Sequence, residues 1–229
     1  IRAVFWVAVI PGMLAVLCVL LGVREPDESA GSSQAKPPID LKALRRLSPA
    51  FWTVVAIGVA FTLARFSEAF LILKAHAEGL PLLLAPLVLV VMNAVYSPGI
   101  VSDKVPAPRL LVLGLFALVA ADLSLAYVPG LTGAFVGTAL WGLHMAMTQG
   151  LLAKLVADHA PAHLRGSAFG LFNLATGIAM LFASVIAGLL WDQVGAGATF
   201  LAGAGFAALA ALMVVFRRVH LNADAAPPA

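Results

Sequence analysis

Residues 50–73 read AFWTVVAIGVAFTLARFSEAFLIL, and this stretch decides the fold class. It contains only two charged residues, Arg65 and Glu68. A transmembrane helix needs about 20 mainly apolar residues. Hydrocarbon forces such a segment to be helical, because its backbone polar groups must be bonded internally. The sequence therefore predicts a membrane-spanning helix that carries two ions.

Similar apolar runs occur along the whole chain of 229 residues. Apolar residues make up 62% of it and charged residues 11%, whereas soluble domains have about 45–50% and about 25%. These values exclude an ordinary soluble domain and a disordered chain. The uninterrupted runs argue against a membrane β-barrel, whose strands alternate in polarity. We predict an all-α fold, a polytopic transmembrane helical bundle. Its seven spans are residues 3–23, 50–73, 81–101, 110–128, 132–153, 167–191 and 198–216.

The distribution of Lys and Arg predicts the orientation. A polar linker, residues 24–49, separates the first two spans, and a polar tail occupies residues 217–229. If the linker is cytoplasmic, inside segments hold eleven of the fourteen Lys and Arg residues and outside segments hold two. Positive charge concentrates on the cytoplasmic side of membrane proteins. We therefore expect an integral multi-pass protein of the bacterial inner membrane with a cytoplasmic C-terminus, and no nucleic-acid partner, since no dense basic block is present.

The two ions within residues 50–73 are candidate functional groups. Arg65 and Glu68 are three residues apart, so on a helix they share a face and can form an ion pair. Ionisable groups inside a span usually face a cavity or a partner. One hypothesis is that Glu68 is a water-accessible acid whose protonation changes during a transport cycle. The alternative is a static ion pair that fixes the position of the helix.

Other polar side chains fall inside the predicted spans. His144 could bind a ligand or carry a proton, and Gln149, Asn93 and Asn173 could contact a solute. The alternative for each is a hydrogen bond between neighbouring helices. Asp122 lies toward the outer end of its span, where it could pair with a group that is absent from this chain.

The sequence contains no recognisable catalytic or cofactor-binding pattern. His159 and His163 have a spacing that can hold zinc on a helix, but Pro161 separates them. We expect no metal, no cofactor and no enzymatic activity. A membrane-embedded enzyme and a non-transporting scaffold subunit remain as alternatives to a transporter.

Two short loops with acidic and basic residues carry more information. The first contains Gly99, Asp103, Lys104 and Arg109, and the second contains Asp158, Arg165 and Gly166. Glycine permits a tight turn at a helix end, and an acid can cap the positive N-terminus of a neighbouring helix. The alternative is that these residues are only helix caps and orientation signals.

These loops resemble those of the major facilitator superfamily of secondary transporters. The first is similar to that family's G-x-x-x-D-[RK]-x-x-x-R loop, and the second to the loop between helices ten and eleven. The resemblance covers essentially the whole chain. It implies helix six in residues 1–23, the cytoplasmic linker in residues 24–49, and the six-helix C-terminal half of a transporter in residues 50–216.

The resemblance also implies a function. Members of this family consist of two six-helix halves that rock around a site at the membrane midplane. Helices seven and ten line the central cavity, and these would contain Arg65, Glu68, His144 and Gln149. The loop residues would form cytoplasmic gate contacts. The expectation is alternating-access transport of a small solute, coupled to protons, by a protein whose N-terminal half is missing from this chain.

The sequence leaves several points open. The substrate, the coupling ion and the direction of transport are not indicated, because drug export and metabolite uptake by a permease or antiporter fit equally well. The chain starts at Ile1 inside an apolar run and has an odd number of predicted spans. We therefore expect an incomplete piece of a longer transporter.

Overall fold

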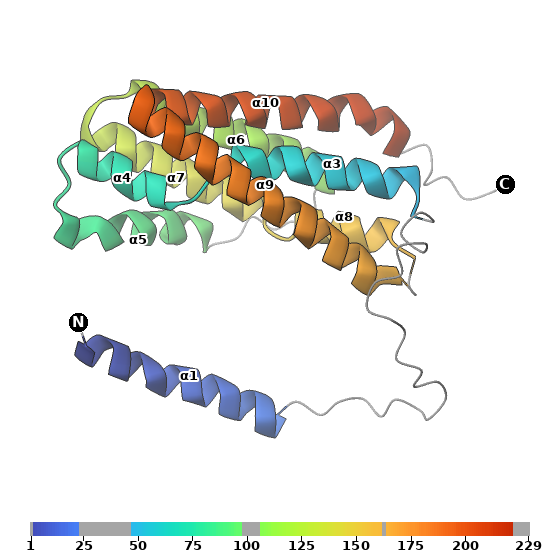
Figure 1. Cartoon of the computed structure of the whole chain (residues 1–229), viewed down its shortest axis with the longest axis horizontal. Helices are drawn as coiled ribbons and strands as arrows, with labels where there is room; N and C mark the ends of the chain where they lie inside the picture. The colour runs from blue at the N-terminus through green and yellow to red at the C-terminus, as the bar shows by residue number, and fades with distance from the viewer. Residues whose placement is uncertain (1, 23–46, 98–105, 162–163, 222–229) are drawn as a thin grey trace. The chain divides into compact units, whose positions relative to one another are not determined.

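The computed structural model describes residues 2–22, 47–97, 106–161 and 164–221, and in these ranges its regular elements are all helical. The chain divides into two units, Ile1–Pro38 and Ile39–Ala229. The first unit contains α1 (Arg2–Gly22). The second contains α3 (Pro49–Ala64), α4 (Ala69–Ala77), η1 (Leu82–Leu84), α5 (Ala85–Tyr96), α6 (Ala107–Tyr127), α7 (Gly130–Thr148), α8 (Leu151–His159), α9 (Arg165–Gln193) and α10 (Ala196–Leu221) (Figure 1). The predicted all-α class is confirmed.

Four stretches of the described chain are long and apolar enough to cross a membrane. They are Pro49–Ala77, Arg109–Tyr127, Arg165–Gln193 and Ala196–Phe216. Two shorter apolar stretches, Val9–Cys18 and Leu82–Tyr96, fall within the predicted spans 3–23 and 81–101. The end of the latter prediction, residues 98–101, lies outside the described residues.

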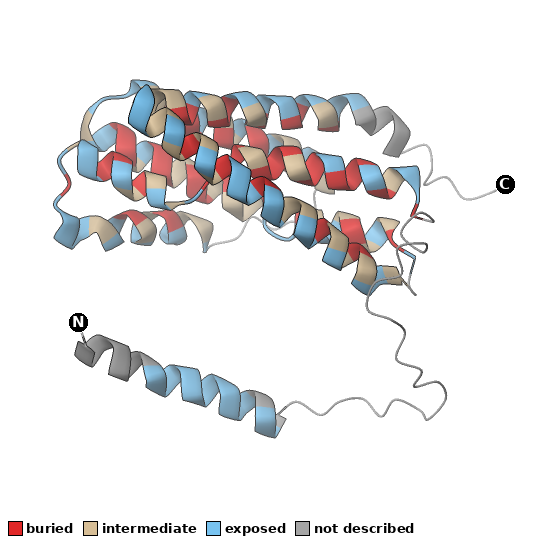
Figure 2. Ribbon diagram, in the orientation of Figure 1, coloured by how far each residue is buried: buried red, intermediate tan, exposed pale blue. Residues whose placement is uncertain are grey.

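The helices of the second unit pack around α3 and α6. α6 packs against α7 and α10, while α3 packs against α9 and α10. Apolar side chains on α3 are buried at the three- and four-residue intervals that place them on one side of a helix, namely Phe51, Val54, Ile57 and Phe61. Figure 2 shows this burial along α3 and α7, in contrast to the largely exposed α9.

α9 crosses α3 at an angle and contacts both α3 and α10 (Figure 1). Its buried positions Ala179, Ala183 and Ala187 are four residues apart, and small side chains allow close approach of helices in a membrane. The remaining surface of α9 presents large apolar side chains, including Leu181 and Val185. This surface is suited to lipid or to further helices.

The prediction of one continuous helix over residues 50–73 is wrong, because α3 ends at Ala64 and α4 begins at Ala69. Arg65 leaves the helical conformation, with φ −109° and ψ 76°, and its N–H donates to the carbonyl of Thr62. The intervening residues contain neither proline nor glycine. Non-helical backbone at membrane depth is tolerated only where protein or a water-filled cavity surrounds it. The break therefore marks an interior position.

The prediction of one helix over residues 132–153 is wrong as well. α7 ends at Thr148, and α8 begins at Leu151 after Gly150, which has a φ of +82°. Only glycine adopts this conformation without steric penalty. Two of the predicted spans are therefore discontinuous helices.

A carboxylate at the end of α4 ties that helix to the start of α7. Glu78 Oε1 accepts a hydrogen bond from Lys74, and Glu78 Oε2 accepts one of 2.7 Å from the backbone N–H of Gly130. These bonds stabilise the ionised carboxylate and lower the pKa of Glu78 below its ordinary value of 4.5, with the Lys74 bond as the larger cause. The contact joins two segments 52 residues apart in sequence.

The lowered pKa of Glu78 predicts a pH-dependent contribution to stability. The contribution is fully present above pH 4.5 and is lost as the pH falls through the lower folded-state pKa. Glu78→Gln is therefore expected to lower the free energy of unfolding near neutral pH and to differ less from the wild type as the pH falls below 4.5. Unfolding in detergent micelles at a series of pH values measures this. Asp192→Asn, at an exposed acid without an ion pair in the described segments, should cost less stability near neutral pH, and an equal deficit of Glu78→Gln at all pH values would contradict the assignment.

Candidate functional site

The break between α3 and α4 holds the predicted ion pair. A guanidinium nitrogen of Arg65 lies 3.9 Å from Glu68 Oε1, and the two side chains are 21% and 38% exposed. At this distance the pair attracts through charge but makes no hydrogen bond, which requires about 2.7–3.2 Å. Both ions are thus partly accessible and loosely held, so other charged groups can compete for them.

Phe61 connects this pair to the predicted histidine. The Arg65 guanidinium carbon lies 5.9 Å from the centre of the Phe61 ring, within the range of a cation–π contact. The other neighbour of that ring is the imidazole of His144, at a centroid distance of 5.3 Å and a tilt of 31°. Arg65, Phe61 and His144 therefore form a stack that links α3 to α7.

His144 is fully buried, and its tautomer follows from its partner. Nδ1 lies 2.8 Å from the carbonyl oxygen of Gly114 on α6. A carbonyl can only accept, so Nδ1 carries a proton, and in the neutral form of the ring Nε2 presents a lone pair. That Nε2 has no hydrogen-bond partner in the described chain, and neither does the indole N–H of Trp141, one turn earlier on α7. α7 thus holds one unpaired acceptor and one unpaired donor near the break.

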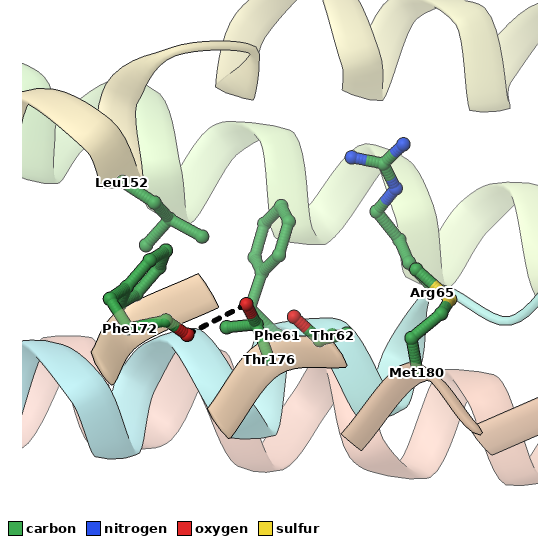
Figure 3. Close-up of a pocket in the computed structure, with 7 residues that line it drawn as sticks. All are labelled: Phe61, Thr62, Arg65, Leu152, Phe172, Thr176 and Met180. Atoms are coloured by element: carbon green, nitrogen blue, oxygen red, sulfur yellow. Dashed lines mark hydrogen bonds between the residues drawn. The ribbon is translucent and has the colours of Figure 1, made fainter. Parts of the chain in front are cut away.

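A cavity of about 180 Å³ adjoins the ion pair between α3, α8 and α9. Figure 3 shows its lining residues, with the Phe61 ring and the Arg65 guanidinium pointing to the same side. The residues are Phe61, Thr62, Arg65, Leu152, Phe172, Thr176 and Met180. The cavity is therefore mainly apolar and carries one positive charge.

Three of the predicted solute or proton contacts are not gathered at this site. Gln149 is exposed at the C-terminal end of α7, and Asn173 is exposed on α9 beside the cavity residue Phe172. Asn93 is exposed on α5 and donates a 2.7 Å hydrogen bond to the carbonyl of Leu89 in its own helix. The structure thus groups Arg65, Glu68 and His144 and leaves the three amides apart.

Part of the predicted cytoplasmic gate lies outside the described residues, namely Gly99, Asp103 and Lys104. Arg109, Asp158, Arg165 and Gly166 are exposed at helix ends. Ion pairs within the described segments involve Arg65 with Glu68 and Lys74 with Glu78, so Asp158 and Arg165 are not paired there. In the same segments, no three His, Cys, Asp or Glu side chains come together as a metal site would require.

Asp122 differs most from its expected environment. It is fully buried in α6, and a Cβ atom added to Gly203 of α10 would lie 2.8 Å from its Oδ2. Neither carboxylate oxygen has a hydrogen-bond partner among the described residues. The position toward the outer end led to the expectation of a partner beyond this chain, but the carboxyl group is enclosed by α6 and α10.

Sequence reasoning missed the cavity and the aromatic side chains around the break. Phe66, within the break, contacts the rings of Phe70, Trp141 and Phe200 at centroid distances of 5.3, 5.6 and 5.7 Å. Aromatic and apolar residues are common in every span, so their type alone gives no signal. The distance in sequence from Phe66 to Arg65 would indicate a place in the site only if the break between α3 and α4 were known.

Comparison with known proteins adds an independent observation. The chain matches the family model described as Major Facilitator Superfamily over residues 1–183 and 95–228. It is 30% identical over 173 residues to an uncharacterized MFS-type transporter of Methanocaldococcus jannaschii. The alignment covers 71% of this chain and 43% of that relative, so the chain spans less than half the length of the curated relative that it matches.

Proposed function

Since this chain belongs to the major facilitator superfamily, we propose that it forms part of a proton-coupled transporter of small solutes that works by alternating access. Glu68 is the coupling acid in this proposal. Arg65 is its counter-ion, and His144 supplies a further polar contact. The alternatives are a membrane-embedded enzyme and a non-transporting scaffold.

One observation carries the proposal, namely the partly exposed ion pair in the break of a membrane span. Discontinuous helices supply the substrate and ion sites of many transporters, because their free backbone ends and polar side chains can face a cavity at membrane depth. Here Arg65 lines a cavity and its partner Glu68 is 38% exposed. A pair with a purely structural role has no need of this accessibility.

The geometry suggests how a proton could be coupled to movement. Ionised Glu68 attracts Arg65 across 3.9 Å, and a proton on Glu68 removes that attraction. Both residues lie where α3 gives way to α4, so a change in the pair acts at a point where the chain can bend. If Glu68 binds a proton more tightly in one arrangement of the helices than in the other, protonation shifts the population toward the first arrangement. The size of the shift equals the difference between the two proton-binding free energies.

The arrangement of the complete protein is part of the proposal. Residues 1–23 correspond to helix six, 24–49 to a cytoplasmic linker, 50–216 to the C-terminal half and 217–229 to a cytoplasmic tail. The chain then lacks the N-terminal half of the transporter. The proposal includes a location in the bacterial inner membrane with the C-terminus in the cytoplasm, which the bias of Lys and Arg supports.

Labelling of a cavity position tests alternating access. Cys18 is a free thiol, the single cysteine of the sequence, so a Cys18→Ser background permits a single reporter thiol. We expect Thr176→Cys, in the cavity wall, to react with a membrane-impermeant thiol reagent from both sides of sealed vesicles. A proton gradient should change the ratio of the two rates, because it biases the two states.

The matched control is Ala183→Cys, a buried position on the same helix, which should react slowly from either side. Reaction of Thr176→Cys from one side only, with no response to the gradient, would overturn the transporter proposal and favour a scaffold or an enzyme with a fixed opening. The labelling requires the protein as its gene encodes it, reconstituted in native lipids.

A further inference from the structure

The walls of the cavity beside Arg65 indicate the size and character of a ligand. Four of the seven lining side chains are apolar, namely Phe61, Leu152, Phe172 and Met180. An apolar cavity of about 150 Å³ accommodates a benzene molecule, and this cavity measures about 180 Å³. It therefore has room for one aromatic ring or an aliphatic group of similar size.

The hydrogen-bonding groups of the cavity select the charge of that ligand. Thr62 Oγ1 donates to the carbonyl of Gly58 at 2.8 Å, and Thr176 Oγ1 donates to the carbonyl of Phe172 at 2.8 Å (Figure 3). Both hydroxyl protons are thus used within their own helices. A guanidinium has five N–H donors, and no hydrogen bond engages the Arg65 guanidinium in the described chain. The hydrogen-bond donors that remain free in the cavity wall are therefore those of the positively charged Arg65 guanidinium.

From these features we infer that the solute is an organic anion with a ring-sized apolar part, whose carboxylate takes the place of Glu68 at Arg65 while Glu68 takes up a proton. The inference rests on the proposed function and names the substrate class of the same site. The apolar part lies against Phe61, Phe172 and Met180. Guanidinium binds carboxylate through two parallel hydrogen bonds, which the 3.9 Å contact with Glu68 does not supply.

Charge balance couples the anion to the proton. Arg65 and ionised Glu68 sum to zero, so an added anion would leave one uncompensated negative charge inside a predicted membrane span, where such a charge is costly. A proton transferred from hydronium restores neutrality, since one O–H bond of hydronium breaks as the O–H bond on Glu68 forms, and a water molecule is left. The other titratable groups that interact with Arg65 are Tyr96 of α5 and His144 of α7. Anion and proton therefore bind together.

Calorimetry with benzenesulfonate tests the inference, because this ring-sized anion stays ionised across the working pH range. The protein as its gene encodes it is reconstituted in lipid nanodiscs and titrated in buffers of different ionisation enthalpy, which reveals proton uptake. We expect binding with uptake of about one proton. Benzyl alcohol and benzylammonium should bind at least about tenfold more weakly, a difference of about 1.4 kcal/mol.

Variants assign the charge and the proton to residues. Glu68→Gln should bind benzenesulfonate without proton uptake, since Arg65 is free and the amide cannot titrate. Arg65→Gln should lose the preference for the anion, while Arg65→Lys should keep part of it and so controls for folding. Tyr96→Phe should bind with unchanged proton uptake. Uptake that survives in Glu68→Gln would overturn the role of Glu68.

The inference about the solute and the proposal of transport fail in different ways. If benzylammonium or benzyl alcohol binds as tightly as benzenesulfonate, the anion class is wrong, whatever the labelling of Thr176→Cys shows. If that labelling shows no alternating access but benzenesulfonate binds with proton uptake, the site is an anion site in a protein that does not transport. Calorimetry therefore tests the class of the solute, and thiol labelling separately tests transport.

Discussion

Glu68→Gln is expected to abolish proton-driven accumulation of solute while the protein still inserts and folds. Glutamine keeps the size and hydrogen-bonding shape of a protonated glutamate but cannot gain or lose a proton. A pH gradient of one unit supplies about 1.4 kcal/mol per proton, which supports about a tenfold concentration ratio if one proton moves with one solute. The variant should reach a ratio of one, because nothing links its movement to the gradient.

Proteoliposomes with an imposed pH gradient measure this effect, with any solute that the wild-type protein accumulates. Exchange of labelled solute at equal concentrations needs no net proton movement, so Glu68→Gln should retain it. Glu78→Gln is the matched control, since this acid lies at the end of α4 away from the break and should leave accumulation intact. Unchanged accumulation by Glu68→Gln would show that another group carries the proton.

Composition and hydropathy were sufficient to predict the class of the fold. An apolar run long enough to cross a bilayer has few structural choices, since unpaired backbone groups are too costly in hydrocarbon. The helices over residues 110–128, 167–191 and 198–216 accordingly agree with the predicted spans within a few residues. These three spans could be predicted without knowledge of the helices that pack against them.

The breaks could not be predicted to the same degree, because one is marked in the sequence and the other is not. Gly150 permits the left-handed conformation between α7 and α8, and its position beside Gln149 could have indicated an end. Between Ala64 and Ala69 no residue forbids a helix, so the break there reflects packing. Within the break, Phe66 packs against Trp141 of α7 and Phe200 of α10.

The candidate site shows the same limit. Arg65 and Glu68 were identified because ions in an apolar run are exceptional, and their spacing predicted a pair that is present at 3.9 Å. Phe61 and Trp141 resemble dozens of other apolar residues in the sequence, yet the former joins Arg65 to His144. Asp122 is fully buried, whereas the Glu68 side chain is 38% exposed. The sequence could not predict this difference, because burial depends on which helices pack together.

Asp122→Leu is expected to raise the free energy of unfolding by about 1–3 kcal/mol, the penalty that an unpaired buried polar group carries. The carboxyl group is fully buried, lies against Gly203 and has no hydrogen-bond partner among the described residues. Leucine branches at the same carbon and has the same number of side-chain heavy atoms, so among apolar residues it follows the outline of the aspartate side chain. Asp122→Lys should lower the free energy of unfolding by several kcal/mol, the cost of an unpaired buried ion, which is a large part of a total stability of about 5–15 kcal/mol.

Ser124 provides the contrast on the same helix, because its hydroxyl is buried but bonded, with Oγ 3.3 Å from the carbonyl of Gly133. Ser124→Ala should therefore lower the free energy of unfolding by about 1 kcal/mol, opposite in sign to Asp122→Leu. Reversible unfolding in mixed micelles, followed by tryptophan fluorescence, measures both. If Asp122→Leu is instead less stable than the wild type, the buried carboxyl group makes a stabilising hydrogen bond to a partner such as an enclosed water molecule. The sign of the change in the free energy of unfolding of Asp122→Leu thus separates two cases. An increase means that Asp122 is kept in α6 for a reason other than stability, and a decrease means that it makes a structural hydrogen bond between α6 and α10.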